Sequence, residues 1–188
     1  MRVLFVVNTP YQLMTAIRII DTQYLNDNVD LCIGDTIADV NSLYERINNV
    51  GLFENISIIE KKKYANKKNK LSFVFDYLAL GCGKKGVFQQ YIYENKYDEI
   101  YIANIDKINK LLYRVLSRKN KLIKVHLYED GFATYSNAYG SYFSSLYSVK
   151  NRIKSIFVFN KIYYNIFSMR VFTPELVVWK PRFDIVSI

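Results

Sequence analysis

Short apolar runs alternate with helical patterns along the first two thirds of this 188-residue chain, and this alternation limits the fold more than any other feature. The apolar runs are VLFVV (3–7), VDLCIG (29–34), ISIIE (56–60), EIYIAN (99–104) and LIKVHLY (122–128). Segments 9–20, 38–50, 71–95 and 105–119 between them have the spacing of amphipathic helices. Unbroken apolar strands separated by helices are typical of a parallel sheet covered on both faces. The sequence therefore predicts an α/β fold with a Rossmann-like, doubly wound parallel sheet.

Polar residues gather directly after three of the predicted strands. They are Asn8, Thr9 and Gln12 after the first, Asn104 and Asp106 after the fourth, and Glu129, Asp130 and Gly131 after the fifth. Ligands of such sheets bind outside the carboxyl ends of the strands, so we expect these residues to line one crevice. Neither GxGxxG nor GxxxxGK[ST] follows the first strand, which argues against a typical nucleotide-phosphate loop.

The adjacent acids at 129 and 130 admit two interpretations. Successive side chains of a strand point in opposite directions, so one acid would face the crevice as a general base while the other supports the turn. Gly131 would let the backbone turn sharply. The alternative is an ordinary strand-to-loop turn, for which Asp-Gly is a common signal.

The net charge of +9 predicts a surface that attracts anions. The segment KKKYANKKNK (61–70) holds six lysines in ten residues. Such a run is usually a solvated loop, and the alternative is peripheral contact with an anionic membrane or another polyanion. Nucleic acid is not an expected partner, because the basic residues cluster in one loop and no RNP, KH or helix-turn-helix pattern occurs.

Metal binding is also not expected, since the chain has two cysteines and one histidine without metal-ligand spacing. Cys32 and Cys82 are expected to be reduced thiols of a cytoplasmic protein. The N-terminal apolar run is too short for a signal-peptide core or a membrane span. We therefore expect a cytoplasmic location, peripheral at the inner membrane face if the lysine run contacts lipid.

The last 50 residues differ from the rest. Residues 141–169 are aromatic and basic, which predicts an amphipathic helix on a membrane surface or packed against this domain or a partner. The segment VFTPELVVW (171–179) predicts a new strand. The expected organisation is one domain over 1–170, with 171–188 beginning a second domain that is otherwise missing. An apolar face left by a missing domain would favour a homodimer.

Two segments, VLFVVNTPYQLMTAIRII and LYEDGFATYS, together resemble the bacterial sialyltransferases of glycosyltransferase family 52, which make sialylated lipooligosaccharides and capsules. The resemblance implies a two-domain GT-B architecture that binds the glycan acceptor on the first domain and CMP-sialic acid on the second. It also implies inverting transfer without a metal or other cofactor. Asp130 would deprotonate the acceptor hydroxyl, Glu129 and Gly131 would shape the turn, and Asn8, Thr9 and Gln12 would line the acceptor crevice.

One feature departs from that family. Its members stabilise the departing CMP with a His-Pro motif in the second domain, whereas His126, the only histidine here, lies inside a predicted strand and precedes Leu127. We expect it to be a satisfied core or interface residue. Two hypotheses follow: the chain is the acceptor and general-base half of a sialyltransferase, or it is a non-catalytic, truncated glycan-binding or relic Rossmann-like module.

Overall fold

The computed structural model describes residues 1–62, 74–76, 78–79, 88–136, 140–141, 143 and 161–188. Cys82, most of the lysine run and most of the aromatic, basic segment lie outside these residues. In the described part of the predicted 71–95 helix, residues 74–76, 78–79 and 90–94 are helical.

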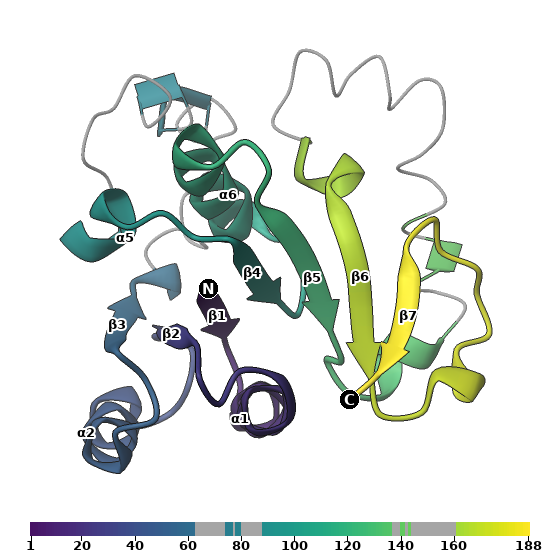
Figure 1. Ribbon diagram of the computed structural model, residues 1–188, viewed down its shortest axis with the longest axis horizontal. Coiled ribbons are helices and arrows are strands. Elements are labelled where there is room, and N and C mark those ends of the chain that lie inside the picture. The colour runs from purple at the N-terminus through teal and green to yellow at the C-terminus, as the bar shows by residue number, and fades with distance from the viewer. Residues whose placement is uncertain (63–73, 77, 80–87, 137–139, 142, 144–160) are drawn as a thin grey trace.

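Seven parallel strands form a single sheet in the order β3-β2-β1-β4-β5-β6-β7 (Figure 1). They are β1 (Arg2–Val7), β2 (Asn28–Gly34), β3 (Asn55–Ile59), β4 (Glu99–Ile102), β5 (Lys124–Tyr128), β6 (Ile166–Val171) and β7 (Asp184–Ser187). The main helices are α1 (Pro10–Gln23), α2 (Val40–Val50), α5 (Gln90–Glu94) and α6 (Lys107–Lys119). The predicted α/β fold with a Rossmann-like parallel sheet is confirmed.

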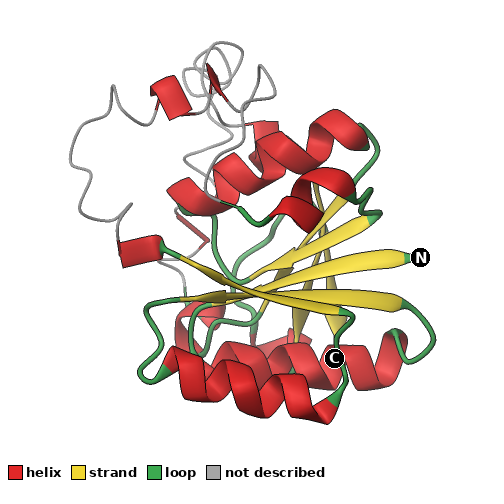
Figure 2. Cartoon of the chain, turned by 90° about the vertical axis from the view of Figure 1, so that its left-hand side faces the viewer, coloured by secondary structure: helices red, strands yellow, loops and turns green. Residues whose placement is uncertain are grey.

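Helices cover both faces of the sheet (Figure 2). Alternating residues of β1 divide between two cores: Val3, Phe5 and Val7 pack with α1 and α2, while Leu4 and Val6 pack with α5 and α6. Burial on both faces explains why the strand sequences are apolar without interruption. The crossovers reverse direction between β1 and β4, and in open α/β sheets this switch point is where ligand crevices form.

The C-terminal strands correct two predictions. β6 ends at Val171, where we expected a strand to begin, and it takes up part of the predicted 141–169 helix. Pro174 explains the error at 171–179, because proline lacks an amide donor and restricts the residue before it. Residues Pro174–Leu176 form a 3₁₀ turn, and β7 then pairs with β6. Residues 171–188 thus complete the same sheet as residues 1–170, and a second domain stays a prediction.

The segment between β6 and β7 also packs on the loop that follows β5. Trp179 is buried, its indole Nε1 donates to the Thr134 carbonyl at 2.9 Å, and its ring stacks on Phe143 with centroids 5.7 Å apart. A Cβ on Gly140 would lie only 2.3 Å from the Trp179 Cβ, so only glycine fits at this contact. The tail therefore fixes the loop that carries the acidic pair.

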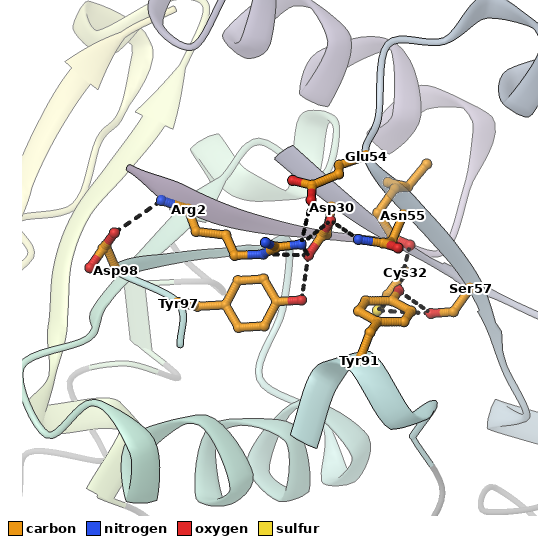
Figure 3. Close-up of polar contacts among 10 residues, drawn as sticks. Arg2, Asp30, Cys32, Glu54, Asn55, Ser57, Tyr91, Tyr97 and Asp98 are labelled. Carbon is orange, nitrogen blue, oxygen red and sulfur yellow. Dashed lines mark hydrogen bonds and ion pairs between the residues drawn. The ribbon is translucent and has the colours of Figure 1, made fainter. Parts of the chain in front are cut away.

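A polar cluster around the buried Asp30 joins β1, β2 and β3 to the segment before β4 (Figure 3). Asp30 is fully buried and accepts from Arg2 Nε at 3.0 Å, Asn55 Nδ2 at 2.9 Å and the Tyr97 hydroxyl at 2.5 Å. Arg2 also lies 3.3 Å from Glu54 and donates its backbone amide to Asp98 at 2.9 Å. Burial of this charge is offset by complete pairing, which is what a buried carboxylate requires.

His126 lies in the core, as predicted. It is buried, its Nδ1 lies 2.7 Å from the Ser168 hydroxyl, and its ring stacks on Tyr101 at 4.6 Å. Its Nε2 lies 3.3 Å from a carboxylate oxygen of Glu99, which also accepts from the Tyr24 hydroxyl at 2.6 Å. The only histidine of the chain is thus part of a buried network that joins three strands and α1.

Glu99 should make stability depend on pH. Burial alone would raise its pKa, but the contact with His126, the hydrogen bond from Tyr24 and the charge of Lys124 lower the pKa from 4.5 to about 2. A depressed pKa in the folded state adds stability above pH 4.5 that disappears as the pH falls towards 2. We expect Glu99→Gln to cost about 1–3 kcal/mol of unfolding free energy at pH 7. In urea denaturation the difference from the wild type should shrink below pH 4.5, and a constant difference would contradict this account.

Candidate functional site at the carboxyl edge of the sheet

The Thr-Pro-x-Gln segment turns the end of β1 directly into α1. Thr9 is the N-cap residue, and its hydroxyl accepts from the Gln12 amide at 3.1 Å. Pro10 takes the first helical position, where its missing amide costs nothing. This local geometry points Gln12 back towards the sheet edge.

Gln12 links the first strand to the fifth. Its side chain is 1% exposed, and its Oε1 accepts from the Asn8 backbone amide at 2.6 Å. Its Nε2 donates to Oδ1 of Asp130. The structure therefore brings together two segments that lie more than 100 positions apart, and a buried amide holds one oxygen of the Asp130 carboxylate in place.

Glu129 is buried and fully engaged. One of its carboxylate oxygens accepts from the Tyr11 hydroxyl, and the other accepts from the Tyr135 hydroxyl and from the Phe172 amide at 2.9 Å. Burial first, and then the bond to Glu129, raises the pKa of both tyrosines, so both hydroxyls remain protonated donors at neutral pH. Hydrogen bonds to Glu129 thus connect α1, the turn after β5 and the end of β6.

Asp130 has a different environment from its neighbour. It is partly exposed, its amide donates to the Thr134 hydroxyl at 3.0 Å, and Gly131 follows with a φ of +85°, a backbone conformation that favours glycine. Within the described part of the chain, Gln12 is the residue that bonds its carboxylate, and it bonds only Oδ1. The buried acid of the pair therefore supports the turn, and the partly exposed acid keeps one oxygen that no described residue bonds.

Asn104 and Asp106 lie in a second group beside the first. A cavity of about 360 Å³ is lined by Asn8, Thr36, Lys61, Asn104, Asp106, Lys107 and Ile108. Asp106 caps α6, because its Oδ1 accepts from the Asn109 amide at 2.8 Å, and its Oδ2 pairs with the ammonium of Lys61. Asn8 connects the two groups, since its side chain lines the cavity and its amide bonds Gln12.

Sequence reasoning missed Lys61 and Thr36. Lys61 begins the lysine run, whose composition predicts a solvated loop, yet this lysine is only 7% exposed. The available signal was its position, because it comes directly after β3 and so reaches the same sheet edge as the predicted residues. Lys62, the next residue, is exposed, as predicted for the run.

Two findings concern only the described residues. Among them, no group of three or more histidine, cysteine or acidic side chains is placed to hold a metal ion. None of their helices is both long and apolar enough to cross a membrane. Cys32 is a buried free thiol whose Sγ lies 3.3 Å from the Ser57 hydroxyl.

Comparison with known proteins identifies the family. The family described as alpha-2,8-polysialyltransferase (POLYST) matches residues 3–182, which is nearly the whole chain. No curated protein matches. The chain belongs to the alpha-2,8-polysialyltransferase family. This match confirms the expectation of a bacterial sialyltransferase family, while glycosyltransferase family 52 and the N-terminal position stay predictions. The protein is a sialyltransferase-like glycosyltransferase whose family uses a glycan acceptor and a sugar-nucleotide donor.

Proposed function

We propose that this chain provides the acceptor side and the general base of a sialyltransferase that moves sialic acid from CMP-sialic acid to the terminal sugar of a bacterial surface glycan. The observation that carries the proposal is that the two adjacent acids have different environments. Glu129 is buried and occupied by two tyrosines and a backbone amide, while Asp130 is partly exposed and oriented by Gln12. A carboxylate held in this way at the carboxyl edge of a parallel sheet is suited to accept a proton from a bound hydroxyl.

The proposed reaction is an inverting single displacement without a metal. Oδ2 of Asp130 takes the proton of the acceptor hydroxyl, and the hydroxyl oxygen attacks the anomeric carbon of sialic acid. The bond from that carbon to the CMP phosphate oxygen breaks, and CMP leaves with the bonding electrons. The role of Gln12 is to hold Oδ1, so that Oδ2 faces the acceptor.

The family description suggests the acceptor and the linkage. An α2,8 bond joins the anomeric carbon of one sialic acid to the 8-hydroxyl of another. We therefore propose a sialyl acceptor whose 8-hydroxyl lies beside Asp130, in the synthesis of a capsule or lipooligosaccharide glycan. The donor would be held mainly by a second domain of a GT-B pair, as the resemblance to glycosyltransferase family 52 implies.

The alternative is a non-catalytic glycan-binding module. It is favoured by the burial of His126, which keeps the only histidine away from a departing CMP. One assay distinguishes the two hypotheses. The protein is expressed from its complete reading frame and incubated with CMP-sialic acid and α2,8-linked trisialic acid. Elongation of the acceptor with release of CMP would establish the transferase, and binding of the acceptor without elongation would favour the module.

Cytoplasmic location, peripheral membrane contact and a homodimer stay predictions. The lysine run that would contact an anionic membrane lies mostly outside the described residues. Flotation of the protein with vesicles that contain anionic lipid would test the contact directly.

Gln12 should affect the rate more than the fold. We expect Gln12→Leu to lower kcat by about 10- to 100-fold, because a base displaced by an ångström loses much of its effect. The kinetics should be measured in parallel with thermal unfolding, and Gln23→Leu is the matched control, since Gln23 is exposed at the other end of α1. A Gln12→Leu variant with wild-type kcat would show that this amide does not position the base.

A further inference from the structure

The cavity beside the acidic pair contains a buried cation. Lys61 follows β3, its side chain is 9% exposed, and its ammonium pairs with Oδ2 of Asp106. An ammonium has three donors, and within the described residues the carboxylate of Asp106 is the acceptor of one. Taking a lysine out of water is costly unless its charge is compensated, and Asp106 supplies that compensation at the cavity wall.

The charge around the cavity is positive overall. Asp106 contributes one carboxylate, which Lys61 neutralises and which also caps α6. Lys107 adds a second ammonium, and Lys107 and Ile108 place the first turn of the 13-residue helix α6 on the cavity wall. The amides of a helix's first turn have no acceptor within the helix, and the helix dipole favours an anion there.

Two asparagines supply buried polar atoms that the described residues leave without partners. Both side-chain polar atoms of Asn8, and Oδ1 of Asn104, are buried and make no hydrogen bond to any described residue. Buried polar groups are almost always satisfied, because a group left unsatisfied destabilises the folded state. Both residues line the cavity of about 360 Å³, which is within the size range of small-ligand sites, and this favours a polar ligand there.

We propose that this cavity is the subsite that binds the carboxylate of a sialyl residue, with Lys61 as its charged partner and Asn8 and Asn104 as partners of adjacent polar groups. The inference rests on the proposed function and adds the residues that recognise the substrate's charge. Asn8 also bonds Gln12, which holds Asp130, so a sugar in this cavity lies next to the base. The terminal sialic acid of the acceptor is therefore the expected occupant. The sialic acid of the donor carries the same carboxylate and is the other source.

Gly34 gives an independent way to disturb the subsite. A Cβ at this position would lie 2.6 Å from Oδ1 of Asn8 and 3.1 Å from Cδ of Lys61. Both contacts are with side chains that can move, so Gly34→Ala should displace the two ligand-binding groups while the fold is kept. It removes no charge, which separates the geometry of the site from its electrostatics.

The test compares α2,8-linked trisialic acid with the same acceptor whose terminal carboxylate is converted to an amide. The wild type should prefer the carboxylate by about 10- to 100-fold in kcat/KM, the range expected for a charge-assisted hydrogen bond. Lys61→Met should reduce this preference to about threefold or less, and Gly34→Ala should reduce it partly. Lys62→Met is the matched control, because its side chain is exposed and does not line the cavity.

Each outcome is decisive. Loss of the preference in Lys61→Met supports the subsite and assigns it to the acceptor. If Lys61→Met keeps the preference for the carboxylate acceptor but raises the KM for CMP-sialic acid at least tenfold, the subsite is supported and is assigned to the donor. If Lys61→Met changes neither quantity, the inference is wrong even though transfer occurs. If the wild type transfers nothing, the proposed function fails, and calorimetric titration with the carboxylate and amide forms of trisialic acid still tests the subsite. The subsite is supported if the wild type binds the carboxylate form more tightly and Lys61→Met removes this difference in affinity. Equal binding of the two forms by the wild type overturns it.

Discussion

Replacing Asp130 by Asn should lower kcat for sialyl transfer by about 10²–10⁴, the usual contribution of a general base. Asn has nearly the same shape and still accepts a hydrogen bond from Gln12 through its carbonyl oxygen, so the turn should be preserved. It cannot accept the acceptor's proton, and the hydroxyl must then attack without deprotonation. We expect the KM for the acceptor to change little, because Lys61 and the two asparagines of the cavity are untouched.

The loss of turnover must be separated from a loss of structure. Asp184→Asn is a suitable control, since Asp184 is exposed at the beginning of β7. Unfolding by urea should give the same midpoint for the wild type and for Asp130→Asn. A variant that transfers at the wild-type rate would remove Asp130 from the mechanism, and one that is inactive because it unfolds would favour the ordinary turn.

The largest effect on stability should come from Asp30. We expect Asp30→Ala to cost about 3–5 kcal/mol of unfolding free energy, the usual result of removing one partner from a buried ion pair. The substitution leaves the Arg2 guanidinium with the more exposed Glu54 as its carboxylate partner among the described residues, and it deprives Asn55 and Tyr97 of their acceptor (Figure 3). These contacts hold the strands together away from the proposed site, so any folded fraction should retain its acceptor affinity.

Equilibrium urea denaturation at pH 7 measures this effect. The matched control is Asp21→Ala, since Asp21 is exposed and its ion pair within the described residues is an i,i+3 contact of 3.6 Å with Arg18. Surface pairs of this kind contribute about 1 kcal/mol or less. A loss below about 1 kcal/mol for Asp30→Ala as well would show that the buried cluster does not stabilise the sheet.

The first five strands, and helices α1, α2 and α6, could be predicted because their patterns are local. Each strand is an unbroken apolar run that both faces of the sheet bury, and the helices have clear apolar stripes. β6 was not predicted because Ser168 and Arg170 interrupt its apolar pattern. Ser168 is nevertheless buried, and the reason is its contact with His126 on the neighbouring strand, which the sequence does not reveal.

The site could be predicted only in part for a similar reason. The topology of a parallel sheet places the strand ends together, so Asn8, Asn104 and Asp130 could be assigned to one edge. Which acid faces outward depends on contacts that Glu129 makes with Tyr11, Tyr135 and the Phe172 amide, and two of these come from distant segments. Lys61 was missed because its neighbours form a solvated run and only its place after β3 distinguishes it.

The most direct test of the proposed mechanism is the crystal structure of the Asp130→Asn variant with α2,8-linked trisialic acid bound. We predict that the terminal 8-hydroxyl lies about 2.6–3.2 Å from the side chain at position 130, within reach for proton transfer. The carboxylate of the same sugar should face Lys61. A glycan bound at another edge of the sheet, or an acceptor hydroxyl beyond the reach of position 130 in this complex, would contradict the assignment of Asp130 as the base.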